Sequence, residues 1–143
     1  MNEDTKKLLE ECNSGCKMAI NSMNQVGEYV QDDRLKKVFD NYKGKHGKME
    51  EESAEMLKEC GLPEKEPGAA ASAFSWITTE MKMMMKDDNN QIAKLMMDGC
   101  NMGVKSITED QHKYADASKE AMALSKKLVQ ADEDFMNDLK AFL

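Results

Sequence analysis

The chain has 143 residues, a formal net charge of −7, 14 methionines and only two prolines. This length suffices for one domain with a hydrophobic core, and the acidic charge argues against nucleic acids and anionic membranes as partners. No stretch approaches the roughly 20 apolar residues that span a bilayer, and the acidic start lacks the apolar region of a secretory signal. We therefore expect a single domain over residues 1–143, located in the cytoplasm, with reduced cysteines.

The first element is predicted to be a helix from Asp4 to Val30. Its apolar positions recur in alternating steps of three and four residues, which is typical of a helix packed lengthwise in a bundle. These positions are Leu9, Cys12, Cys16, Ala19, Met23, Val26 and Val30. Two of the four cysteines therefore lie on one inward stripe of this helix.

A second helix is predicted from Asp33 to Cys60, after a tight turn in which Asp32 or Asp33 caps its start. Because the connection is so short, we expect the two helices to be antiparallel neighbours. The inward positions follow the same pattern and include one histidine: Leu35, Phe39, Tyr42, His46, Met49, Ser53, Met56 and Cys60. Gly61 and Pro63 indicate where the helix ends.

A shorter helix is predicted from Ala71 to Lys86. It has more apolar faces than one contact requires, with Phe74 and Ile77 on one side and Trp76 and Met83 on another. An apolar patch without a partner usually marks an interface, so we expect a homodimer or larger homo-oligomer. Replacing both Trp76 and Met83 with glutamate should then give monomers in sedimentation.

Two further long helices complete the chain. One is predicted from Gln91 to Tyr114, and its Gly99 and Gly103 are typical of a close helix approach. The last is capped by Asp116 or Ser118 and runs to about Phe142. The inward residues of the two helices are Ile92, Met96, Cys100, Gly103 and Ile107, and then Ala121, Leu124, Leu128, Ala131, Phe135, Leu139 and Phe142.

These elements predict an all-α fold, since no segment alternates with period two as a strand does. Four long helices and one short helix indicate a four-helix bundle, with the short helix in the crossover between the second and third long helices. At ~1.5 Å per residue its roughly 16 residues cover about 24 Å, enough to carry the chain back along the bundle. The third long helix would then run parallel to the second, which is the one-crossover topology of ferritin-like folds.

Four short stretches of the sequence also resemble those of a known protein family. They are Asp32-Asp33-Arg34-Leu35, Glu59-Cys60-Gly61-Leu62-Pro63, Ala73-Phe74-Ser75-Trp76 and the acidic break before Gln91. As a set they resemble the ferritin-like bundles of uncharacterised bacterial proteins, a domain of unknown function. The resemblance covers nearly the whole chain. Because most of that family has no assigned activity, it implies a fold more than a function.

Ferritin-like enzymes hold two irons with a Glu from two helices and Glu-x-x-His from two others. This chain largely lacks that set, because Cys16 and Cys100 stand near positions where inward acids are expected, and Lys43 replaces the Glu that would precede His46. One Glu-x-x-His does occur, Glu109–His112, but it falls near the end of its helix, where we expect it to be exposed. A di-iron enzyme is therefore the weaker hypothesis.

Four side chains can instead converge at mid-height and bind a metal. Counting from the helix ends at ~1.5 Å per residue places Cys16, His46 and Cys100 within about 8 Å of one height. Cys12 lies one turn from Cys16, and Asp132 can lie near. Three thiolates and an imidazole form a common tetrahedral zinc site, and neighbouring methionine sulfur would also suit monovalent copper.

The sequence leaves three functions open. The first is a non-enzymatic ferritin-like bundle with zinc or copper at Cys12, Cys16, His46 and Cys100. The second is a structural or protein-interaction bundle whose Cys and Met only fill the core, with the histidine satisfied by Glu50 or Tyr42. The third is a di-iron or peroxide-handling enzyme.

Metal binding has a direct test. Chelation should lower the melting temperature of the wild type but not of Cys16→Ser, because a bound metal stabilises only the folded state. Cys60, at a helix end, is the thiol expected to be exposed and outside the cluster. Cys60→Ser should therefore respond to chelation as the wild type does.

Overall fold

A computed structural model describes residues 2–62 and 88–143. Within these ranges it contains helices and no strand, which confirms the all-α class. The elements are α1 (Glu3–Gly27), α2 (Asp33–Glu59), α4 (Asn89–Lys113), α5 (Lys119–Leu139) and the 3-10 turn η2 (Lys140–Phe142). The short helix predicted over Ala71–Lys86, with its interface residues Trp76 and Met83, lies outside the described residues.

Each long helix begins where a polar side chain can accept hydrogen bonds from the first free backbone N–H groups. The capping residues are Asn2 for α1, Asp32 for α2, Asp88 for α4 and Ser118 for α5. The helix starts therefore fall within two residues of their predicted positions. The end of α1 differs more, because residues 28–30 leave the helix as a turn in which Val30 N–H donates to the Gly27 carbonyl at 3.1 Å.

The end of α2 depends on Gly61, which adopts a left-handed φ of 72°. Its N–H donates to the Lys58 carbonyl at 2.9 Å, and Leu62 N–H donates to the Leu57 carbonyl at 2.9 Å. This pair of bonds is the Schellman arrangement, which satisfies carbonyls left free at the helix end. Gly61 thus ends the helix by its backbone conformation, as its place in the sequence predicts.

Gly61→Ala is expected to lower the free energy of unfolding by about 1–2 kcal/mol, since a left-handed conformation is unfavourable for a residue with a Cβ. Gly44→Ala is the matched control, because Gly44 lies inside α2 and a Cβ there meets nothing within 4 Å. That change should stabilise by about 0.5–1 kcal/mol through helix propensity. Urea unfolding of both variants checks the prediction, and equal effects at the two positions would contradict it.

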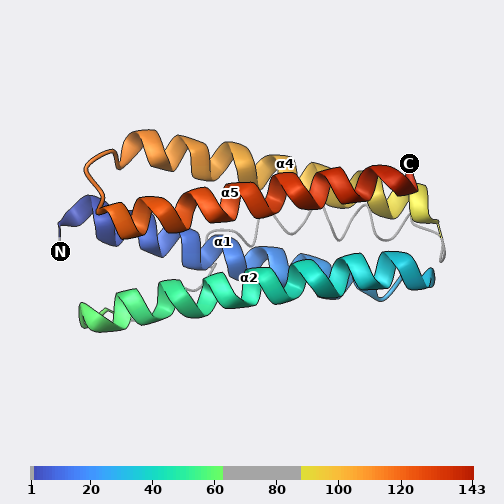
Figure 1. The fold of residues 1–143 in the computed structure, drawn as a ribbon, viewed down its shortest axis with the longest axis horizontal. Helices are drawn as coiled ribbons and strands as arrows, with labels where there is room; N and C mark the ends of the chain where they lie inside the picture. The colour runs from blue at the N-terminus through green and yellow to red at the C-terminus, as the bar shows by residue number, and fades with distance from the viewer. Residues whose placement is uncertain (1, 63–87) are drawn as a thin grey trace.

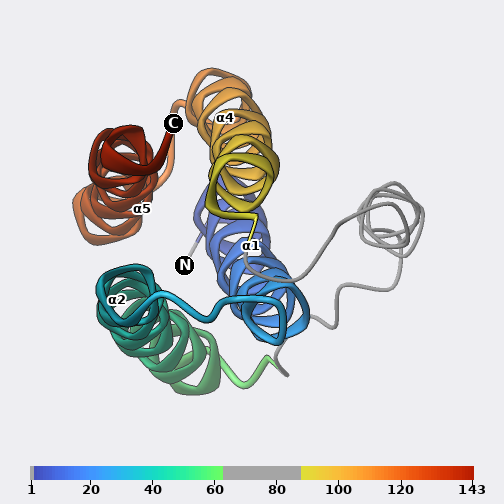
Figure 2. The same cartoon turned by 90° about the vertical axis from the view of Figure 1, so that its right-hand side faces the viewer.

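The four long helices pack as a bundle in which each runs antiparallel to its neighbours (Figure 1). Asn89 at the start of α4 donates from Nδ2 to Oδ2 of Asp32 at 3.2 Å, so α4 begins at the same end of the bundle as α2. The two helices are therefore parallel. Seen from the end, α1 lies between α2 and α4, and α5 closes the bundle between the same two helices (Figure 2).

The buried side chains form two apolar clusters, one toward each end of the bundle. The cluster near the α1–α2 turn contains Phe39, Tyr42, Cys100 and Phe135, and the other contains Cys12, Cys16, Leu57 and Leu128 among its members. The two cluster residues that flank His46 on α2 are Tyr42 and Met49, one from each cluster. A polar layer thus interrupts the core at mid-height. None of the helices in the described ranges is long and apolar enough to cross a membrane.

Candidate functional site

The polar layer is built on a hydrogen bond between His46 of α2 and Asp132 of α5. His46 is fully buried and Asp132 is 6% exposed. The imidazole Nε2 lies 2.8 Å from Oδ1 of Asp132, and Nδ1 lies 2.7 Å from the backbone carbonyl of Tyr42. Both ring nitrogens therefore have partners. The sequence offered Glu50 or Tyr42 as partners, and the structure shows the Tyr42 backbone together with Asp132.

The protons of this pair follow from its geometry. A carbonyl oxygen only accepts, so Nδ1 of His46 carries a hydrogen that it donates to Tyr42. The contact between Nε2 and Oδ1 of Asp132 then needs one further proton, on the nitrogen or on the oxygen. In either arrangement the pair is neutral as a whole, and Oδ2 of Asp132 can only accept a hydrogen bond.

Oδ2 of Asp132 faces α4 at Gly103. A Cβ added to Gly103 would lie 2.6 Å from Oδ2, closer than any real contact. Glycine here lets the carboxylate lie against the helix, so the close approach expected at Gly103 is found, with a side chain as the approaching group. At Gly99 a Cβ meets nothing within 4 Å, and the expectation of a close approach there is wrong.

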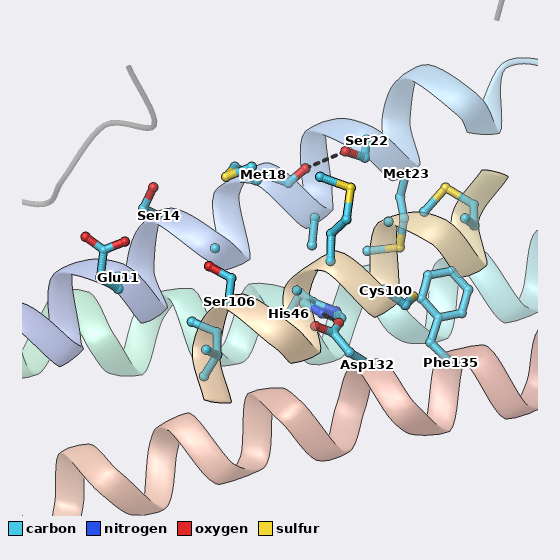
Figure 3. Close-up of a pocket in the computed structure, with 17 residues that line it drawn as sticks. Glu11, Ser14, Met18, Ser22, Met23, His46, Cys100, Ser106, Asp132 and Phe135 are labelled. Carbon is cyan, nitrogen blue, oxygen red and sulfur yellow. Dashed lines mark hydrogen bonds and ion pairs between the residues drawn. The ribbon is translucent and has the colours of Figure 1, made fainter. Parts of the chain in front are cut away.

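Beside this pair lies a cavity of about 260 Å³ between α1 and α4, partly open to solvent where the exposed Met102 and Ser106 line it (Figure 3). His46 and Asp132 point toward one another in its wall, with Cys100 and Phe135 next to them. The other described lining residues are small side chains, methionines, one isoleucine and one acid: Glu11, Ser14, Gly15, Met18, Ala19, Ser22, Met23, Met96, Gly99, Met102, Gly103, Ser106 and Ile107. The cavity is thus mainly apolar, with the carboxyl group of the buried Asp132 in its wall.

Two carboxyl groups and one imidazole of the described residues line the cavity. Burial raises the pKa of Asp132 above its usual value, and its hydrogen bond and charge interaction with His46 oppose that shift. Glu11 contributes a second carboxyl group to the lining, whereas the described lining residues include neither lysine nor arginine. Oδ2 of Asp132 has no hydrogen bond within the described structure. The arrangement can therefore accept a hydrogen bond from a molecule in the cavity.

The four predicted metal ligands are buried, but the structure does not group them as a ligand set. Cys12 and Cys16 belong to one apolar cluster, Cys100 belongs to the other, and His46 is engaged with Asp132. Among the described residues no three His, Cys, Asp or Glu side chains are placed so that they could hold a metal ion. Zinc or copper binding stays a prediction from the sequence, without support from this geometry.

The di-iron hypothesis requires several inward carboxylates. Within the described ranges Asp132 is the only buried acidic side chain. Glu109 and His112 are both exposed near the end of α4, as the sequence predicts. These placements leave the hypothesis without a ligand set among the described residues.

The buried thiols are poor nucleophiles. Burial, with smaller contributions from Asp110 and Glu11, raises the pKa of Cys12 to about 12. Burial is also the main cause that raises the pKa values of Cys16 and Cys100 well above the ordinary thiol range. Because the thiolate is the reactive form, these three side chains stay protonated and unreactive near neutral pH.

Iodoacetamide at pH 8 is therefore expected to modify Cys60 alone in the folded protein, since Cys60 is the one partly exposed thiol. Denaturation in urea should expose all four cysteines, and intact-mass measurement should then show four adducts. Cys60→Ser is the matched control and should give no adduct until it unfolds. A rapid second adduct in the folded wild type would contradict the burial of the other thiols.

The cavity itself was not predicted from the sequence. The sequence feature that could have indicated the cavity is a set of small residues on one side of α1 and α4. Among them are Gly15, Ala19, Gly99 and Gly103. Small residues indicate either a close approach of two helices or space between them, and the sequence alone does not distinguish these. Asp132 was placed near the cluster, but its bond to His46 was not foreseen.

Comparison with known proteins assigns no family: no family model, no curated protein and no solved structure matches the chain. A function has to be argued from the chemistry of the site in any case, because one fold can support many activities.

Proposed function

We propose that the protein is a non-enzymatic helical bundle that binds a small, mainly apolar molecule in the cavity between α1 and α4. The observation that carries the proposal is Oδ2 of the buried Asp132, an acceptor without a hydrogen bond among the described residues, beside a mainly apolar space of about 260 Å³. Ligand sites are typically apolar, with a few placed polar groups that fix orientation. His46 supports this role by holding the carboxylate in one position.

The cavity volume sets the size of the ligand. An engineered apolar cavity of about 150 Å³ in another protein accommodates benzene, so the 260 Å³ here suits roughly ten non-hydrogen atoms at similar packing. The methionines in the lining are flexible and polarizable, so they can adjust to a range of shapes. We infer a ligand of about the size of a bicyclic aromatic or an eight-carbon chain.

We also infer that the bundle is ferritin-like. Support comes from the helix directions, because the diagonal helices α2 and α4 are parallel, whereas neighbouring helices are antiparallel. This arrangement agrees with the one-crossover topology of ferritin-like folds. The proposal concerns architecture and carries no di-iron chemistry with it.

Indole, with nine non-hydrogen atoms and one N–H donor, is a suitable first probe. At a hundred times its dissociation constant, a ligand of the folded state should raise the free energy of unfolding by about 2.7 kcal/mol. Ala19 lines the cavity, so Ala19→Phe should fill part of it and abolish the rise in melting temperature. Ala123→Phe, at an exposed position of α5, is the matched control and should respond as the wild type does. Equal responses from both variants would place the binding outside the cavity.

A further inference from the structure

We propose that the ligand of this cavity is an organic amine, bound as the ammonium cation with an N–H group directed at Oδ2 of Asp132. This inference rests on the proposed function and names the chemical class of its ligand. It follows from three features of the cavity: the hydrogen-bonding capacity of its acceptor, the charges in its lining and its length.

The acceptor at the cavity wall requires a donor. Oδ1 of Asp132 forms a hydrogen bond with Nε2 of His46 at 2.8 Å. Nδ1 of His46 forms a hydrogen bond with the Tyr42 carbonyl at 2.7 Å. The remaining oxygen, Oδ2, can only accept in either protonation arrangement of the pair. A ligand group that only accepts, such as a carboxylate, would leave two acceptors facing one another in a buried place. Next to Oδ2 of Asp132, an amine or an alcohol group therefore fits and a carboxylate group does not.

The charges in the lining favour an ammonium group over a hydroxyl. The described lining contains the carboxyl group of Asp132 and neither lysine nor arginine. The pair with His46 is neutral as a whole, but Oδ2 of Asp132, the oxygen that His46 does not engage, lies against Gly103 in the cavity lining. A cation placed there gains a charge-assisted hydrogen bond, roughly twice as strong as a neutral one. The net charge of −7 over the chain acts in the same direction at longer range.

The cavity lining follows α1 over about three turns. On that helix it extends from Glu11 to Met23, which at ~1.5 Å per residue corresponds to about 18 Å. Methionines at positions 18, 23, 96 and 102 provide an adaptable apolar wall along this length. This shape suits an alkyl or arylalkyl body with the amine at one end, near Asp132.

Calorimetric titration with three probes of one chain length tests the inference: octylamine, octan-1-ol and octanoate at neutral pH. We expect octylamine to bind at least tenfold more tightly than octan-1-ol, and octanoate to show no binding. Failure of all three to bind would remove the proposed function together with this inference. Octan-1-ol that binds as tightly as octylamine would overturn the inference and leave the proposed function standing.

Asp132→Asn is the matched variant. An asparagine can donate its amide N–H to His46 and keep a carbonyl oxygen near the position of Oδ2, so the acceptor is retained while the carboxyl group is lost. The preference for octylamine over octan-1-ol should fall to threefold or less. An unchanged preference would overturn the inference.

A second readout uses the wild type alone and does not depend on how well the variant folds. The backbone amide signal of Gly103 should shift when octylamine binds, because Gly103 lies against Oδ2 of Asp132. Gly44 has no atom within 4 Å of its Cβ position and does not line the cavity, so its signal should stay in place. Binding that leaves the Gly103 signal unchanged would overturn the inference.

Discussion

Asp132→Leu is expected to lower the free energy of unfolding by about 3–5 kcal/mol, the usual effect of removing one partner of a buried pair. Leucine branches at Cγ as aspartate does, so the change leaves no empty space in the core. It leaves Nε2 of His46, a fully buried side chain, without a partner in an apolar surrounding. The loss therefore reports the unmatched imidazole more than any change in packing, and urea unfolding measures it.

The double variant His46→Leu/Asp132→Leu should recover most of this stability, because two apolar side chains can pack across the layer without any unpaired group. Glu133→Leu is the control for helix α5, since Glu133 is exposed beside Asp132, and it should change stability by no more than about 0.5 kcal/mol. The prediction would be contradicted if Asp132→Leu lowered the free energy of unfolding by less than about 1 kcal/mol and the double variant recovered none of it. His46 and Asp132 would then not stabilise one another as a buried pair.

Much of the bundle was predictable because helix faces follow directly from sequence period. The inward stripe that placed His46 in the core is confirmed by its complete burial, and Asp32 caps α2 as expected. The direction of α4 was predicted from the distance that the connecting segment can span, and the bond between Asn89 and Asp32 confirms it. These are local or topological properties, which a period and a length can determine.

The site was less predictable, because period fixes the face of a helix and leaves its rotation and axial shift undetermined within several Å. Cys16 and Cys100 were placed near one height, and the charge of Asp132 contributes to the raised pKa of both thiols, yet the two belong to different apolar clusters. His46 and Asp132 are separated by 86 residues in the chain and bond across the bundle. A displacement of one helical turn, about 5.4 Å, would separate the two side chains, so their contact could only be found in the structure.

Gly103→Ala is expected to destabilise the protein by about 1–3 kcal/mol relative to Gly99→Ala, although both changes improve helix propensity by about 1 kcal/mol. At Gly99 the new methyl group meets nothing within 4 Å, so that variant should be more stable than the wild type. At Gly103 the methyl group would lie 2.6 Å from Oδ2 of Asp132. The carboxylate cannot move away without weakening its bond to His46, and a hydrogen bond to a charged group contributes about 1.5–3 kcal/mol.

A double-mutant cycle identifies the cause. In an Asp132→Ala background the atom that collides with the new methyl group is gone, so Gly103→Ala should there become stabilising, as Gly99→Ala is in the wild type. Neighbouring residues that share a contact typically show such coupling, with interaction energies of about 0.5–3 kcal/mol. Equal effects of Gly103→Ala in both backgrounds would contradict the close approach of Asp132 to α4. The same approach orients Oδ2 beside the cavity, so a measured coupling would connect the stability of the bundle with the acceptor that we propose binds the ligand.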